Sequence, residues 1–122
     1  MQGKRLERVN QLIKEEVSVL LQRELKDPRL GFVTVTEVDV TPDLKYAKVY
    51  VSVLGRDAQW AASFQALDSA RGFVWSWLRR HLDLRVTPEI TFHPDRSMEH
   101  AAHIQSLLAE LRTKARDAGA AP

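Results

Sequence analysis

The chain has 122 residues, no cysteine and a formal net charge of +2 at pH 7. This length suits one domain with its own core, and the lack of cysteine excludes disulfides, thiolate zinc sites and cysteine nucleophiles. No apolar run approaches the roughly 18 residues of a membrane span, and no apolar stretch follows the basic N-terminus as in a signal sequence, so we expect a soluble, cytoplasmic protein without a membrane partner.

The first predicted element is an amphipathic helix over residues 4–25. Its apolar side chains recur at spacings of three and four residues, as expected for one buried helix face. They are Leu6, Val9, Ile13, Val17, Leu20, Leu21 and Leu25. Pro28 disfavours helical geometry at Asp27, so the helix should end before this pair.

From Gly31 the apolar period changes to two, which predicts a strand. The valines before and after Thr36-Glu37 fall in opposite phases, so we expect a β-bulge at that point. Residues 41–44 have turn chemistry, and residues 45–53 alternate again between apolar and polar side chains. The two runs therefore predict a β-hairpin with one buried face.

Two helical patterns follow, and Asp57 is expected to cap the first. The apolar side of the first helix is predicted to hold Trp60, Ala61, Phe64 and Leu67. The second is predicted to turn inward Phe73, Val74, Trp77, Leu78, His81 and Leu82.

The step between the two helices is Ala70-Arg71-Gly72. Gly inside a helix costs about 1 kcal/mol relative to Ala, so Gly72 predicts a bend and is expected to set the angle between the helices. Arg71 lies at this bend and further arginines follow it. Cations around the backbone N–H groups of a helix start indicate a candidate phosphate site.

Thr87-Pro88 ends the helical pattern, and residues 89–93 predict a short third strand. Ser97 is expected to cap a last helix that extends through Leu111, and residues 118–122 have the composition of a frayed end. The order helix, strand, strand, helix, kink, helix, strand, helix predicts an α+β domain with a three-stranded sheet covered on one face. This is the element order of a type II KH domain, which we place at residues 1–111, followed by a flexible C-terminal tail at 112–122.

Lysine and arginine concentrate in residues 1–29, 71–85 and 112–117. If these segments converge on one face, they form the positive patch typical of a nucleic-acid binder. The alternative is that they are ordinary solvated helix faces.

Several uncommon segments, occurring in order over residues 4–111, resemble bacterial ribosome-binding factor A. They are the first helix from Arg8 onward, Lys26–Thr36, Lys45–Val53, Ala70–Gly72 and Leu84–Phe92. In this family an Ala-x-Gly kink replaces the phosphate-clamping GxxG loop of ordinary KH modules, and no GxxG occurs in this chain.

The resemblance implies a non-catalytic maturation factor that binds the free small ribosomal subunit and its ribosomal RNA. It further implies support of late assembly and of 5′-end processing of the precursor RNA, with the greatest need in the cold. We expect no cofactor, no metal and no small-molecule substrate, and a monomer when free.

The residues that we expect to contact RNA are Arg5, Arg8, Lys45, Lys48, Ser69, Ala70, Arg71, Gly72, Trp75, Arg79, Arg80 and Arg85. Four of these assignments have structural alternatives. Gly72 could serve helix packing, Trp75 could cover the edge of the core instead of stacking on a base, and a charged Lys45 or Lys48 would also discourage pairing of strand edges.

The strongest rival chemistry is a metal or hydrolytic site on Glu99, His100 and His103, with His93 and Asp95 nearby. The two histidines of the helix are three residues apart, whereas the metalloprotease pattern requires four. No nucleophile elbow, P-loop or dinucleotide fingerprint occurs, so we expect no enzyme. The remaining functional alternative is a KH-like adaptor whose main partner is another protein.

Overall fold

Three strands form one sheet in the order β1-β2-β3 in the computed structural model, which describes residues 2–120. The chain runs through α1 (Gln2–Val19) and a π-helical turn (Leu20–Glu24), β1 (Phe32–Val40), β2 (Tyr46–Leu54), α2 (Asp57–Ser69), α3 (Arg71–His81), β3 (Glu89–Pro94) and α4 (Ser97–Ala120). The predicted α+β class and element order are confirmed.

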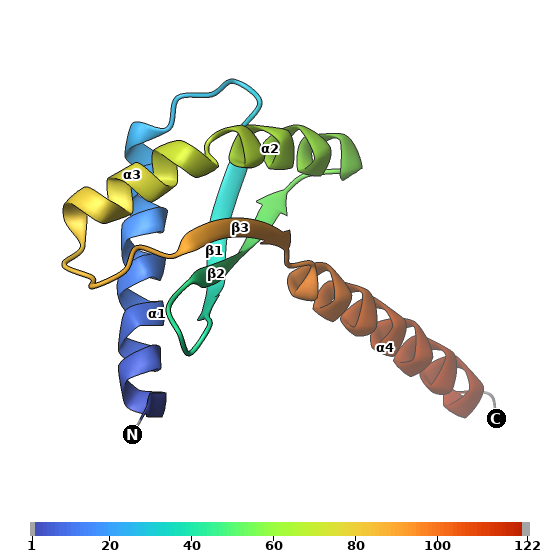
Figure 1. Cartoon of the computed structure of the whole chain (residues 1–122). Helices are drawn as coiled ribbons and strands as arrows, with labels where there is room; N and C mark the ends of the chain where they lie inside the picture. Colours follow the sequence, from blue (N-terminus) through green and yellow to red (C-terminus); the bar gives the residue numbers. More distant parts are fainter. Residues whose placement is uncertain (1, 121–122) are drawn as a thin grey trace.

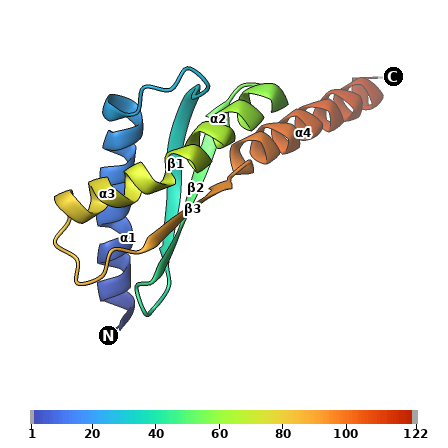
Figure 2. The same ribbon diagram turned by 45° about the horizontal axis from the view of Figure 1, so that its top comes forward.

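The sheet combines one antiparallel and one parallel pairing. β1 and β2 form the predicted hairpin, whose register shifts between Val35 and Glu37, so the bulge lies at Thr36 as expected. β3 pairs with β2 in the parallel direction, from Tyr46 opposite Glu89 onward. Figures 1 and 2 show α1, α2 and α3 gathered around the sheet, while α4 extends away from it.

The core lies between one face of the sheet and the first three helices. Alternate residues of all three strands point into it and are buried, in keeping with the period of two. The buried strand residues are Val35, Val38, Val40, Ala47, Val49, Val51, Val53, Ile90 and Phe92. Ile13 and Val17 of α1, Leu67 of α2, and Val74 and Leu78 of α3 are each fully buried against this face.

The first helix ends close to the predicted place. Leu25 adopts an extended backbone, and its N–H donates to the Leu20 carbonyl at 2.9 Å, which closes the wider π-helical turn. The side chain of Asp27 then accepts the Arg29 backbone N–H at 2.9 Å, so the segment before Pro28 leaves the helix as a turn.

Some details of α2 and α3 differ from the sequence prediction. The N-cap of α2 is Arg56 rather than Asp57, and the Arg56 N–H donates to the Gln59 side chain at 2.8 Å. Asp57 instead occupies the first turn, where its charge complements the helix dipole. Ala61 is exposed while the neighbouring Ser63 is buried, because the face of α2 that meets the sheet is rotated from the predicted one.

Ser63 can lie in the core because its hydroxyl oxygen accepts the Gly31 N–H at 3.1 Å, so the buried hydroxyl has a hydrogen-bond partner. On α3, Phe73 and His81 were expected to turn inward, but both are exposed.

α4 starts at Ser97, but the side chain that accepts the Ser97 N–H is that of Asp95, at 2.9 Å, so the cap precedes the predicted one. The helix continues through Ala120, beyond the point where a frayed end was expected, and residues 121–122 lie outside the described residues. Its apolar side chains Met98, Ile104, Leu107, Leu108 and Leu111 are all exposed. The domain boundary at residue 111 stays a prediction.

Core packing gives the first test. Leu78→Ala removes a side chain that is 0% exposed and should lower the free energy of unfolding by about 2–5 kcal/mol. The matched change Leu107→Ala, on a side chain of α4 that is 44% exposed, should alter it by no more than about 0.5 kcal/mol. Urea unfolding followed by circular dichroism measures both, and equal losses would contradict this placement of the core.

A pH dependence follows from Asp95. The Thr36 hydroxyl donates to its carboxylate at 2.6 Å, and this bond, with the Ser97 N–H, holds the pKa of Asp95 below its usual value. Because the folded pKa lies below the unfolded one, the resulting stability is present above the unfolded pKa and is lost as pH falls through the folded pKa. In Asp95→Asn the urea midpoint should fall less steeply with acid below about pH 4 than in the parent. Parallel pH profiles would contradict the role of Asp95.

Candidate nucleic-acid interface

The bend between α2 and α3 is made by Ala70. Its backbone angles, φ −90° and ψ 0°, leave the helical region, and its side chain is buried. Gly72 lies inside the first turn of α3, has no positive φ, and a Cβ built on it would meet nothing within 4 Å. The expectation that Gly72 sets the helix angle is therefore wrong, because neither its backbone geometry nor its packing requires glycine.

A hollow of about 530 Å³ lies where the kink faces the start of β3. We call it the kink hollow, and it is lined by Asp68, Arg71, Gly72, Trp75, Glu89 and Ile90. Three of the predicted contact residues, Arg71, Gly72 and Trp75, line this hollow. Asp68 and Glu89 were not predicted from the sequence, and they place two acidic residues beside the one arginine that lines the hollow.

Trp75 is fixed at the side of this hollow. Its indole N–H donates to the Thr87 carbonyl at 3.2 Å, and the Arg79 guanidinium lies 5.4 Å from the ring centroid, within cation–π range. The Arg80 Nε donates instead to the Ser76 carbonyl at 3.3 Å. Since consecutive helical residues are about 100° apart, Arg79 and Arg80 point to different sides of α3.

A second hollow of about 320 Å³ brings together segments that are distant in sequence. We call it the N-terminal corner, and it is lined by Arg5, Leu6, Pro42, Asp43, Leu44, Arg85 and Val86. Arg5 comes from the start of α1, and Arg85 from the segment after α3. The corner also holds Asp43, whose pKa lies below its usual value, because the Thr41 hydroxyl and the Lys45 N–H donate to its carboxylate.

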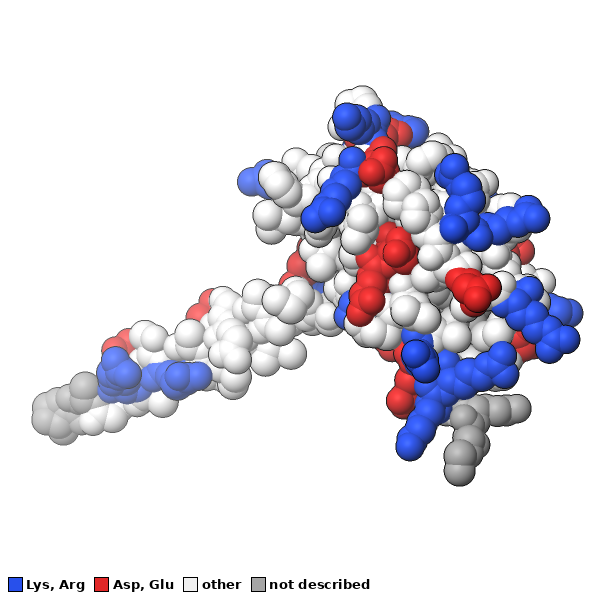
Figure 3. All heavy atoms as spheres, turned by 90° about the vertical axis from the view of Figure 1, so that its left-hand side faces the viewer, with Lys and Arg blue, Asp and Glu red and all other residues white. Residues whose placement is uncertain are grey.

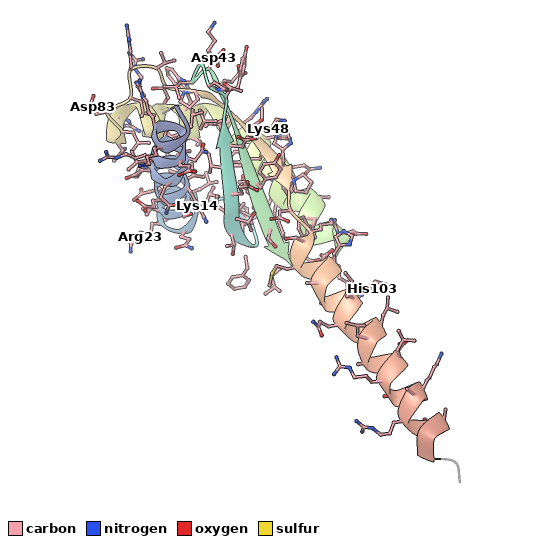
Figure 4. The ribbon with its side chains drawn as sticks, turned by 90° about the horizontal axis from the view of Figure 1, so that it is seen from below. Lys14, Arg23, Asp43, Lys48, Asp83 and His103 are labelled. Carbon is pink, nitrogen blue, oxygen red and sulfur yellow. The ribbon has the colours of Figure 1, made fainter. Side chains whose placement is uncertain are left out.

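The other predicted contact residues are dispersed. Arg8 is exposed on α1, three residues after Arg5, and Lys45 is exposed beside the corner turn. Lys48, labelled in Figure 4, lies on β2 between buried Ala47 and Val49, so it belongs to the opposite, open face of the sheet.

The two residues at the end of α2 have their polar groups occupied within the helix. The Ser69 hydroxyl donates to the Gln65 carbonyl at 2.9 Å. The Ala70 N–H donates to Ala66 at 3.0 Å, and the Ala70 carbonyl accepts the Val74 N–H at 2.9 Å. Ala70 therefore shapes the kink from within the core.

The basic segments converge only in part. On the face shown in Figure 3, lysine and arginine side chains lie around the rim of the body, at its top, right and lower edges, and several acidic side chains lie nearer its centre. The basic residues 112–117 lie on α4, which points away from the body in Figures 1 and 2. We call the exposed arginines on α1, α3 and the segment after α3 the basic edge; they are Arg5, Arg8, Arg79, Arg80 and Arg85.

The rival metal cluster is dispersed as well. Figure 4 shows His103 on the projecting α4, while His93 lies on β3, with its ring centroid 5.6 Å from that of Tyr50. Among the described residues, no group of three or more His, Cys, Asp or Glu side chains could hold a metal ion. Within residues 2–120, none of the helices has both the length and the apolar character that crossing a membrane requires.

Comparison with known proteins decides the family. A family model described as ribosome-binding factor A matches residues 5–108. The chain belongs to this family. A family member from Acetivibrio thermocellus is 50% identical over 107 residues, covering 87% of each chain. Another from Desulfitobacterium hafniense is 53% identical over 104 residues, covering 85% of this chain and 83% of that protein.

Solved structures agree with the family assignment. The crystal structure of ribosome-binding factor A from Thermus thermophilus matches with a TM-score of 0.65 and 26% identity, over 73% of this chain and 94% of that one. A homology model of the Thermus thermophilus factor, fitted into a cryo-EM map of its 30S complex, matches with a TM-score of 0.61 and 28% identity, over 71% and 91% of the two chains. The KH-like fold expected from the sequence is confirmed.

Substitution of Gly72 tests whether this residue sets the kink, and substitution of Gly55, whose backbone does require glycine, is the comparison. Gly55 has φ +140°, and a Cβ there would lie 3.0 Å from Gln59, whereas Gly72 has neither constraint. Gly55→Ala should therefore lower the melting temperature, while Gly72→Ala should leave it unchanged or raise it, since Ala favours helix by up to about 1 kcal/mol. Thermal unfolding measures both. A lower melting temperature for Gly72→Ala than for the parent would restore Gly72 as the residue that sets the bend.

Proposed function

We propose that this protein is a non-catalytic maturation factor of the small ribosomal subunit that binds the free subunit through its ribosomal RNA. The observation that carries the proposal is membership of the ribosome-binding factor A family, one of whose members has been fitted into a map of a 30S complex. A KH-like fold with a basic edge has the chemistry that RNA phosphates require.

The surface proposed for RNA is the side of the molecule on which α1, α3 and the segment after α3 lie next to one another. Arg5 and Arg85 share the N-terminal corner, and Arg8 is exposed nearby on α1. Arg71 and Arg79 belong to the kink side of α3. Recognition would depend on the shape and phosphates of folded RNA, because these cations are spread over a broad edge rather than set in one deep pocket.

The finer parts of the proposal follow from the family resemblance. The protein would act in the cytoplasm late in assembly, support 5′-end processing of the precursor RNA, and be needed most in the cold. It would be a monomer when free and would use no cofactor.

The alternative, a KH-like adaptor for another protein, has one observation in its favour. Phe32 and Leu54 are 80% and 77% exposed on neighbouring strands, and with Met98 of α4 they line an apolar hollow of about 690 Å³. Apolar surface of this kind often marks a protein contact. The two functions differ in their response to salt.

Binding to purified small subunits at increasing salt tests the proposal. Phosphate contacts make the logarithm of affinity fall linearly with the logarithm of salt concentration, and each lost contact flattens that slope by about 0.7–0.9. We expect a steep slope for the parent, and weaker binding with a shallower slope for Arg5→Glu with Arg85→Glu. Sedimentation at several salt concentrations gives both quantities.

The charge-matched control is Arg112→Glu with Arg116→Glu, on exposed residues of α4. This variant makes the same change in net charge but should keep the parent slope. Affinity independent of salt in the parent would support the protein adaptor instead. Equal losses in both double variants would show that net charge, rather than the basic edge, governs binding.

A further inference from the structure

The three most exposed large apolar side chains among residues 2–120 line one hollow. Phe32, Leu54 and Met98 are 80%, 77% and 70% exposed, and they meet in the hollow of about 690 Å³, which we call the sheet-end hollow. Phe32 and Leu54 are opposite each other in the register of β1 and β2, and Met98 lies in the first turn of α4. Contact between water and contiguous apolar surface is unfavourable, so the hollow indicates a binding site for an apolar group.

The sheet-end hollow lies on the face of the sheet that α1, α2 and α3 leave uncovered. Ser52 lines it and lies between buried Val51 and Val53, so its side chain points away from the core. The basic edge belongs to α1, α3 and the segment after α3, on the other side of the sheet. A partner can therefore occupy the hollow while RNA is bound at the basic edge.

One wall of the sheet-end hollow is the start of α4, and Arg96 fixes this wall in place. Its Nη1 donates to Asp57 at 3.0 Å and to Glu99 at 3.1 Å. The Arg96 guanidinium also lies 4.2 Å from the ring centroid of buried Trp60. These contacts join the first turn of α4 to the first turn of α2. A hollow whose walls are already fixed loses little conformational freedom when a ligand binds.

The charged groups around the sheet-end hollow are mainly acidic. Among the described residues that line it, Glu99 is the only charged one. Glu37 and Asp39 of β1 alternate with buried valines, so they point to the same open face. The Asp95 carboxylate is held there as well, because the hydroxyl of Thr36, a residue of the hollow, donates to it at 2.6 Å.

This charge distribution selects among the possible partners. Lys48 lies opposite Asp39 in the register and offsets its charge, which leaves Glu37 and Asp95 to give the neighbourhood a negative potential. RNA phosphates are repelled by such a surface, and a second copy of the chain would bring the same acids against one another. A protein segment with lysine or arginine is attracted to it.

We propose that the sheet-end hollow binds a basic protein segment of the small subunit. The segment inserts one apolar side chain between Phe32, Leu54 and Met98 and places lysine or arginine beside Glu37 and Asp95. This inference rests on the proposed function, because the segment belongs to the subunit whose RNA is bound at the basic edge. The molecule then contacts RNA on one side and protein on the other, so it recognises a site only where both components are in place.

The first test compares purified small subunits with protein-free RNA extracted from them. Phe32→Gln and Leu54→Gln should each bind subunits about 5- to 30-fold more weakly, because each removes an apolar anchor from the interface. Their affinity for protein-free RNA should stay that of the parent. Since both side chains are exposed, circular dichroism and melting temperature should remain native.

The matched control is Leu111→Gln, on a leucine of α4 that is 61% exposed and lies outside the sheet-end hollow. This variant should bind subunits as the parent does. Parent affinity for subunits in both hollow variants, or an equal loss of affinity for protein-free RNA, would overturn the proposal.

The second test uses the sign of a charge effect. Glu37→Gln should weaken subunit binding about 2- to 5-fold, because it removes a charge beside a basic segment. RNA at this face would give the opposite result, since loss of an acid strengthens binding to phosphates. Glu110→Gln, on an exposed residue of α4, makes the same change in net charge and should keep the parent affinity. Unchanged or tighter binding of Glu37→Gln would count against a basic partner.

The partner is identified directly by photocrosslinking in purified subunits, with p-benzoylphenylalanine in place of Phe32. The crosslink should join the chain to a segment of a subunit protein that is rich in lysine and arginine, and Leu54→Gln should lower its yield. Crosslinks to RNA alone, to a second copy of the chain, or to neither would overturn the proposal. If subunit binding depends on Arg5 and Arg85 but not on Phe32 or Leu54, the proposed function stands and the protein contact fails.

Discussion

Parallel pairing of β3 with β2 is the constraint on which the rest of the structure depends. Parallel neighbours cannot be joined by a tight turn, so the chain between Leu54 and Glu89 has to cross one face of the sheet. It does so as α2 and α3. The crossing brings the kink beside the start of β3 and returns the chain past the first turns of α1. The kink hollow and the N-terminal corner both result from this one connection.

The rotation of α3 about its own axis then decides which side chains face outward. Trp77 donates to Glu16 of α1, while Trp75, two residues earlier, donates to the Thr87 carbonyl near β3. Two residues along a helix correspond to about 200°, so the two indoles fix opposite sides of α3. Arg79 and Arg80 therefore point to different sides of α3. Arg79 lies near the Trp75 ring, and Arg80 donates to the Ser76 carbonyl.

Local patterns in the sequence were sufficient to predict the order of the helices and strands and most of their ends. The phase change of the valines around Thr36 predicted the bulge, and Pro28 predicted the end of the first helix within one or two residues. Both signals are local, since they act through backbone geometry and side-chain alternation. Corrections were needed where competing interactions decide the outcome. Ser63 entered the core because a hydroxyl there satisfies the Gly31 N–H.

The candidate site was only partly predictable for the same reason. Asp68, Arg71 and Trp75 could have been grouped from their helical spacing, but Glu89 joins them only through the parallel register of β3, which no local pattern reveals. Glycine at position 72 suggested a strained backbone, whereas the bend lies at Ala70, a residue whose intrinsic preference is for helix and which gives no local signal of a bend. Lys48 lies on the open face of the sheet, because it alternates with buried Ala47 and Val49, and the strand pattern alone does not say which face the helices cover.

The projecting α4 gives the molecule two parts that respond to temperature in opposite ways. The body is held together by buried apolar contacts, which weaken on cooling. α4 exposes its apolar side chains and has to rely on its own backbone hydrogen bonds, and the helix content of such a segment rises as temperature falls. Its 24 residues correspond to a rod of about 36 Å when fully helical. The C-terminal segment should therefore be most rod-like under the conditions in which the core is losing part of its driving force.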